Sequence, residues 1–174
     1  MEYTSAQANK LLKRLNEELE NSINMEAKTS IFHAAMEEDP ETIRPPYDYE
    51  TVQQEQEELK RKIRLVKHAI NKFNVETMIP ELGMTIDQAL IYIPQLTARK
   101  KKLASMRGRL AKERRSESDY FSYRGGSTVL DYTYTNYDMD LVERDYGKVA
   151  EALVNAQMAL DKINNSVMME IDIQ

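Results

Sequence analysis

The stretch VERDYGKVAEALVNAQMALDKINNSV, residues 142–167, decides the fold of this chain. Core-type residues recur in it at alternating spacings of four and three, at Val142, Tyr146, Val149, Leu153, Ala156, Leu160, Ile163 and Val167. This spacing is typical of a helix that buries one narrow stripe against other helices. A second stretch repeats it, at Val52, Gln56, Leu59, Ile63, Val66, Ile70 and Phe73. Both stretches therefore predict long helices that pack along a seam.

Four helices are expected, over residues 5–24, 48–73, 85–115 and 140–165. Their starts carry residues whose side-chain oxygens cap free amide groups, namely Thr4 or Ser5, Asp48, Thr85 and Asp140. Pro94 and the charged run 99–102 interrupt the seam of the third helix. We predict a mainly α fold, an antiparallel four-helix bundle with long coiled-coil-like helices and a small β element.

Residues 119–137 differ in character, because they are rich in tyrosine, threonine and glycine. They predict a β-hairpin with its turn at 124–127. The C-terminus alternates Met169 and Ile171 with polar residues, which indicates a strand. Residues 29–34 are interpreted as another strand, with a helical extension as the alternative. The C-terminal strand would pair with the hairpin or with residues 29–34.

The composition indicates one ordinary domain, residues 1–174. A net charge of -5 argues against a dedicated nucleic-acid binder, whose domain would usually be basic. The first ten residues lack the apolar core of a secretory signal, and no apolar run is long enough to span a membrane as a helix. We therefore expect a cytoplasmic protein with no membrane span.

No pattern of catalytic residues stands out. The chain has no cysteine and two histidines, and neither histidine belongs to a Glu-x-x-His metal motif. His68 lies off its seam and is expected to be exposed. His33 precedes three acidic residues, 37–39, which could imitate a metal cluster, but a solvated acidic turn is the preferred interpretation. We expect no enzyme activity, no metal, no cofactor and no small-molecule ligand.

A basic block in the third helix is the least ordinary feature. Its members are Arg99, Lys100, Lys101, Lys102, Arg107, Arg109, Lys112, Arg114 and Arg115. One interpretation is an anionic partner, such as nucleic acid or a membrane surface. The other, which we favour, is pairing with the acidic residues of the first two helices, Glu17, Glu18 and Glu20 or Glu55, Glu57 and Glu58.

Five tyrosines cluster around the expected hairpin: Tyr120, Tyr123, Tyr132, Tyr134 and Tyr137. Tyrosine is enriched at protein interfaces, so they indicate a contact surface, or alternatively they cover the helix ends. Gln56 in an apolar seam either fixes the register or lies near a solvated helix end. The leading hypothesis is a non-enzymatic interaction or scaffold protein that self-associates. The alternative is a binder of nucleic acid or another anionic surface through residues 99–115.

The order of elements resembles a known family. After a first helix come Asp39-Pro40 in an acidic loop, a second helix with Asn71 and Asn74, and then the segment GMTIDQAL at 83–90. This order is similar to that of small bacterial helical proteins, some of which carry the label septicolysin. Pro94, a longer hairpin and the lack of tryptophan are departures from them. The resemblance implies a helical fold and bacterial origin, and it implies no activity or site residues.

Overall fold

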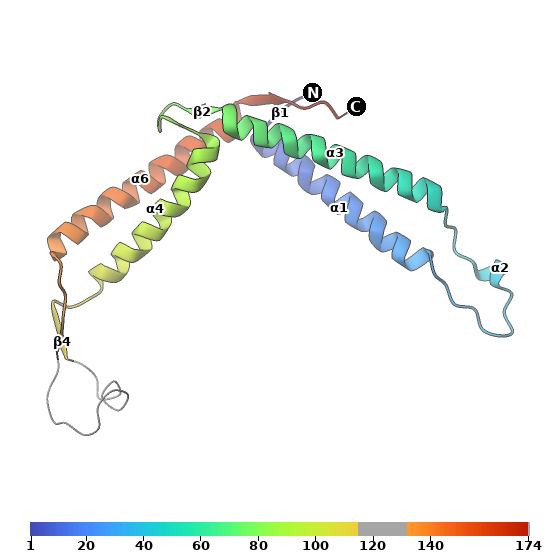
Figure 1. The fold of residues 1–174 in the computed structure, drawn as a ribbon, viewed down its shortest axis with the longest axis horizontal. Coiled ribbons are helices and arrows are strands. Elements are labelled where there is room, and N and C mark those ends of the chain that lie inside the picture. The colour runs from blue at the N-terminus through green and yellow to red at the C-terminus, as the bar shows by residue number, and fades with distance from the viewer. Residues whose placement is uncertain (115–131, 174) are drawn as a thin grey trace, which may run out of the picture. The chain divides into compact units, whose positions relative to one another are not determined.

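The computed structural model describes residues 1–114 and 132–173, and it is mainly helical (Figure 1). Its elements are β1 (Glu2–Thr4), α1 (Ser5–Thr29), α2 (Pro40–Ile43), α3 (Tyr49–Glu76), β2 (Met78–Ile79), β3 (Met84–Thr85), α4 (Ile86–Arg107), β4 (Lys112–Arg114), β5 (Tyr132–Tyr134), α6 (Met139–Ser166) and β6 (Met168–Glu170). The mainly α class with small β elements is therefore confirmed. The chain divides into two compact units, Met1–Asp87 with Leu160–Gln174, and Gln88–Ala159. The unit boundary falls inside α4 and inside α6, and the expected single domain stays a prediction.

The first unit is built on α1 and α3, which lie along each other as a helical hairpin (Figure 1). Thr4 caps α1, because its hydroxyl accepts from the amide of Gln7, whose side chain in turn accepts from the amide of Thr4. Asp48 caps α3 by accepting from the amide of Glu50. Both caps agree with the sequence.

The predicted seam of residues 52–73 lies on the covered face of α3. On α3 the buried side chains are Gln56, Val66, Ile70 and Phe73, and on α1 they are Ser5, Ala8, Leu11 and Leu15. Leu59 and Ile63 follow the same spacing but are only half-buried. A pair of helices covers one stripe of each, so positions beside the stripe stay partly open to solvent.

The two chain ends meet in a small antiparallel sheet. β1 pairs with β6, in a register that sets Glu2 opposite Glu170. The amide of Ile171 donates to the carbonyl of Met1 at 2.9 Å, and the Met1 amino group donates back to the Ile171 carbonyl at 3.2 Å. Met169 and Ile171 are buried, as their alternation indicated. The C-terminal strand is confirmed, but its partner is β1 rather than either segment expected.

Residues 29–34 do not form a strand, so that interpretation was wrong. α1 runs on to Thr29, whose hydroxyl donates to the carbonyl of Met25 at 3.0 Å. The amide of Ser30 closes the last turn by donating to Glu26. The side-chain bond of Thr29 satisfies a polar group within the helix, which offsets the strand preference of a β-branched residue.

The second unit contains most of α4 and α6, which lie side by side (Figure 1). Leu96 and Leu103 are buried on α4, and Val142, Val149 and Leu153 are buried on α6. The amides of Asp140 and Leu141 both donate to the carboxylate of Asp138, at 2.8 and 3.2 Å. Asp138 therefore caps α6, in place of the expected Asp140.

The predicted extent of the third helix was wrong at its end. α4 stops at Arg107, before Gly108, and residues 108–114 do not continue it. Glycine favours this stop because it loses more backbone freedom than other residues in a helix. Lys112–Arg114 instead pairs with Tyr132–Tyr134 as an antiparallel ladder, with Arg114 opposite Tyr132. Tyr132–Tyr134 lies within the expected hairpin of residues 119–137, but its partner strand comes before that hairpin. The expected first arm and the predicted turn at 124–127 lie outside the described residues.

Candidate interaction site

Two arginines of the basic block form ion pairs with α6. Arg99 lies 3.3 Å from the carboxylate of Asp145, and Arg107 pairs with Glu143. The guanidinium of Arg107 also lies over the ring of Tyr146, 4.2 Å from its centroid. Such partly exposed contacts stabilise a fold by about 0.2 to 1 kcal/mol each. They hold the last turns of α4 against the first turns of α6.

Lys100 occupies the position at which the α4 seam should continue. It is half-buried, and its ammonium group lies 6.0 Å from the centroid of the Tyr146 ring. A lysine can bury its aliphatic stem and keep its charge near an aromatic face. The break in the apolar pattern is therefore filled by a cation packed on tyrosine.

The other described residues of the block are exposed, and we call them the basic patch: Lys101, Lys102, Arg109, Lys112 and Arg114. The ammonium group of Lys112 lies 4.1 Å from the ring centroid of Tyr132 and 5.5 Å from that of Tyr134. Within residues 1–114 and 132–173, the other four have no ion-pair partner. Arg115 lies outside the described residues.

The favoured pairing of the block with the acidic residues of α1 and α3 stays a prediction, because the block and those two helices belong to different units. Four of the six carboxylates have partners on their own helices, in the pairs Lys13 with Glu17, Arg14 with Glu18, Lys60 with Glu57, and Arg61 with Glu58. Residues three or four apart on a helix are neighbours, so a local partner is the nearest one available. The hydrogen bond from Arg61 lowers the pKa of Glu58 to about 2.

The tyrosines divide between the two roles considered for them. Tyr132 and Tyr134 are exposed on β5, with ring centroids 6.5 Å apart. Tyr137 is half-buried, and its hydroxyl donates to the carbonyl of Met106 at 2.8 Å. Tyr137 therefore covers the end of α4, whereas Tyr132 and Tyr134 are open to a partner. Tyr120 and Tyr123 lie outside the described part of the chain.

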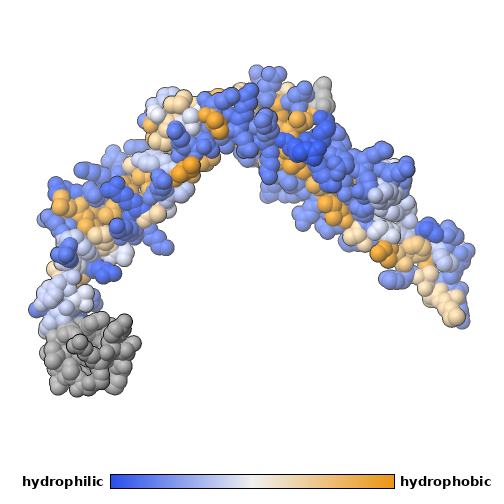
Figure 2. Space-filling view, viewed as in Figure 1, coloured by the Kyte–Doolittle hydropathy of each residue, from blue (hydrophilic) through white to orange (hydrophobic). Residues whose placement is uncertain are grey.

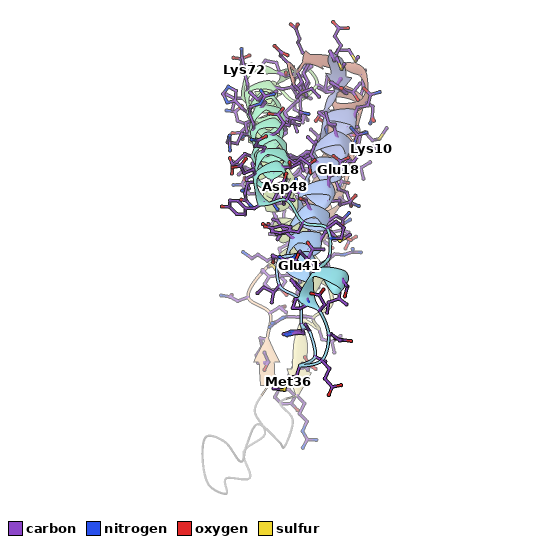
Figure 3. The ribbon with its side chains drawn as sticks, turned by 90° about the vertical axis from the view of Figure 1, so that its right-hand side faces the viewer. Lys10, Glu18, Met36, Glu41, Asp48 and Lys72 are labelled. Carbon is purple, nitrogen blue, oxygen red and sulfur yellow. The ribbon has the colours of Figure 1, made fainter. Side chains whose placement is uncertain are left out.

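A second surface was not anticipated from the sequence. At the loop end of the α1–α3 hairpin, which we call the tip (residues 23–49), large apolar side chains lie in solvent. They are Ile23, Met25, Ile31, Met36, Ile43 and Tyr49. Figure 2 shows hydrophobic residues continuing to this end, and Figure 3 shows Met36 at the far turn of the loop. Their spacing along the chain is irregular and carries no periodic signal, so only the fold reveals the cluster.

The tip has a defined internal structure. The guanidinium of Arg44 lies over the ring of Phe32, 5.3 Å from its centroid, and pairs with Glu41 at 2.6 Å. Asp39 caps α2 by accepting from the amide of Glu41. The contact of Arg44 with Phe32 joins the two sides of the loop, whereas the other two contacts lie within one side.

The first unit also contains an open pocket between α3 and β6, with a volume of about 550 Å³. Phe73, Met169 and Ile171 form its apolar lining, and His68 and Lys72 lie among its polar residues. His68 is exposed, as predicted. In the chain as described, no helix is long and apolar enough to cross a membrane.

No protein-family model and no curated protein matches this chain. Among solved structures, it is similar to a functionally unknown conserved protein from Corynebacterium diphtheriae, with a TM-score of 0.58 and 16% identity. The similarity covers 98% of this chain and 100% of that chain. At this identity it shows the fold alone.

Proposed function

We propose that this chain is a non-enzymatic interaction or scaffold protein whose copies associate with one another. The observation that carries the proposal is the set of exposed apolar side chains at the tip. Ile31 is 72% exposed, and Met36 is fully exposed. Clustered apolar side chains in solvent mark interaction surfaces more often than scattered ones do.

The free energy gained by burying the tip indicates a modest affinity between copies. Burying one such side chain is worth about 1.5 to 3 kcal/mol, whereas bringing two proteins together costs about 4 to 15 kcal/mol. The six apolar side chains of the tip can together supply about 9 to 18 kcal/mol, which is of the same order as that cost. The net of about 8 kcal/mol that a micromolar dissociation constant requires lies within the range of these values.

Size-exclusion chromatography with light scattering tests this proposal. The wild type is expected to exceed its monomer mass of 20.2 kDa as its concentration rises through the micromolar range. Met36→Ser should weaken association, whereas Met158→Ser, at a position 66% exposed on α6, should leave it unchanged. A wild type that stays at monomer mass throughout contradicts the proposal.

We propose further that the four long helices form one antiparallel bundle with coiled-coil-like packing. The support is the 4,3 spacing of buried residues on α3 and α6. In a bundle, the maximum dimension of the dilute protein should be close to the length of one helix and its loops, where 28 residues span about 42 Å. X-ray scattering that gives about twice that length would contradict the bundle.

The proposal includes a cytoplasmic location and membership of the bacterial helical family that the sequence resembles. The helical fold and the bacterial source of the similar structure are consistent with that family. Fluorescence microscopy of a tagged chain in a bacterial host tests the location. A signal confined to the cell envelope would contradict it.

The basic patch favours a second candidate function, binding of nucleic acid or another anionic surface. Residues 88–159 carry twelve lysines and arginines against nine acidic residues, although the whole chain is acidic. Lysine and arginine bind phosphate with an affinity that falls steeply with salt. Retention on heparin that is lost in Lys101→Glu/Lys102→Glu would support this function, and no retention at low salt would contradict it.

A further inference from the structure

We infer that the tip of one copy docks on the basic patch of a second copy. The inference rests on the proposed self-association and names the two surfaces that make the contact. One is acidic and apolar, and the other is basic and carries exposed apolar and aromatic side chains. A contact between unlike surfaces is heterologous, because each copy uses a different face.

The tip is acidic as well as apolar. Within the tip, residues 30–48 carry five carboxylates, at Glu37, Glu38, Asp39, Glu41 and Asp48, against the single cation Arg44, and the remaining tip residues add one charge of each sign. All five are exposed, and Figure 3 shows Glu41 and Asp48 on the same loop as Met36. Glu41 already pairs with Arg44, so the excess negative charge lies mainly at residues 37–39. An apolar surface with carboxylates beside it complements a partner surface that is both apolar and basic.

The basic patch has the matching properties. Lys101, Lys102 and Arg109 supply positive charge without an ion-pair partner among the described residues. Leu110, which lies between Arg109 and Lys112 in the sequence, is 64% exposed, and Tyr134 is 62% exposed. Tyrosine, leucine and arginine together make an apolar surface with positive charge around it. Such a surface complements the tip in both charge and hydropathy.

The charges of the two surfaces also favour the contact between tip and basic patch over its alternatives. Two tips facing each other would bring their carboxylates together, which costs free energy through repulsion. A nucleic acid would neutralise the basic patch but would leave the apolar side chains of the tip in water. A second copy of this chain satisfies both surfaces at once.

Two charge-reversed variants test the inference. The tip variant is Glu37→Lys/Glu38→Lys, and the patch variant is Lys101→Glu/Lys102→Glu/Arg109→Glu. Sedimentation velocity should show each variant alone with a self-association at least tenfold weaker than that of the wild type. An equimolar mixture of the two should regain association, because each variant then offers the surface that the other needs.

Matched controls place the same change of charge elsewhere. Glu20→Lys/Glu55→Lys matches the tip variant, and Lys10→Glu/Lys67→Glu/Lys148→Glu matches the patch variant, all at exposed positions. These controls should associate like the wild type, and circular dichroism should show every variant folded. Controls as weak as the test variants would overturn the inference, because net charge alone would then explain the loss.

The remaining outcomes separate the inference from the proposed function. If both charge-reversed variants associate as well as the wild type, or if their mixture stays dissociated, the inference is overturned and self-association still stands. A wild type that is monomeric at every concentration overturns both. If the patch variant no longer binds a single-stranded oligonucleotide but still associates like the wild type, the basic patch is a nucleic-acid site and the inference is overturned.

Discussion

The side-chain amide of Gln56 on α3 donates a hydrogen bond of 2.8 Å to the carboxylate of Glu26 on α1. Gln53 and Tyr47 donate to the other oxygen of that carboxylate, at 2.7 and 2.8 Å. Gln56 is only 4% exposed, so it does not lie at a solvated helix end. The network joins the last turns of α1 to the first turns of α3 and fixes the base from which the tip projects.

Gln56→Ala should lower the free energy of unfolding by about 1 to 3 kcal/mol, because it leaves a cavity and removes one donor from a partly buried carboxylate. Gln54→Ala changes an exposed glutamine on the same helix and should shift the free energy by less than about 0.5 kcal/mol. Urea unfolding followed by circular dichroism measures both. Equal effects would show that the network contributes no stability of its own.

Leu153 tests the seam of α6. It is 7% exposed, whereas its neighbour Val154 is 49% exposed. Leu153→Ala should cost about 2 to 5 kcal/mol, and Leu153→Asp should unfold the chain, because it buries an unpaired charge. Val154→Ala should cost far less. A folded far-ultraviolet spectrum for Leu153→Asp would refute the placement of this seam.

Arg107 is expected to couple to both of its partners on α6. A double-mutant cycle with Glu143 should give a coupling of about 0.2 to 1 kcal/mol, and one with Tyr146 about 0.5 to 1 kcal/mol. Lys101 has neither contact, so cycles of Lys101 with the same residues should give coupling near zero. Thermal unfolding measures these values. Coupling of the same size at Lys101 would point to a general charge effect.

The lowered pKa of Glu58 predicts how the stability of the fold changes in acid. Its pKa falls from 4.5 to about 2 because Arg61 donates a hydrogen bond to the ionised carboxylate. A lowered pKa in the folded state stabilises the fold above pH 4.5, and this contribution is lost as the pH falls from 4.5 towards 2. Glu58→Gln should therefore lose less stability than the wild type over that interval in urea unfolding. Parallel pH profiles for the two proteins would contradict the assignment.

The sequence predicted those features that depend on residues close to one another along the chain. The seams of α3 and α6 and the caps at Thr4 and Asp48 follow from spacings of a few residues, and the structure contains them. Gly108 also carried a local signal for the end of α4. That signal was outweighed by the apolar residues Met106 and Leu110, which continued the pattern beyond the true end of the helix.

Long-range features were not predictable in this way. β1 and β6 pair residues at opposite ends of the chain, and no local pattern joins Glu2 to Glu170. The partners of Arg99 and Arg107 on α6 depend on which helices are neighbours. The tip emerged only when the fold showed that Ile31 and Met36 are not covered.

Self-association is the central claim, and sedimentation velocity of the wild type at low and high salt tests it most directly. At low salt, a species heavier than the 20.2 kDa monomer should grow with protein concentration. Raising the salt should reduce that species, because it screens the attraction between the tip and the basic patch. A single species of monomer mass at every concentration and both salt levels would contradict the claim.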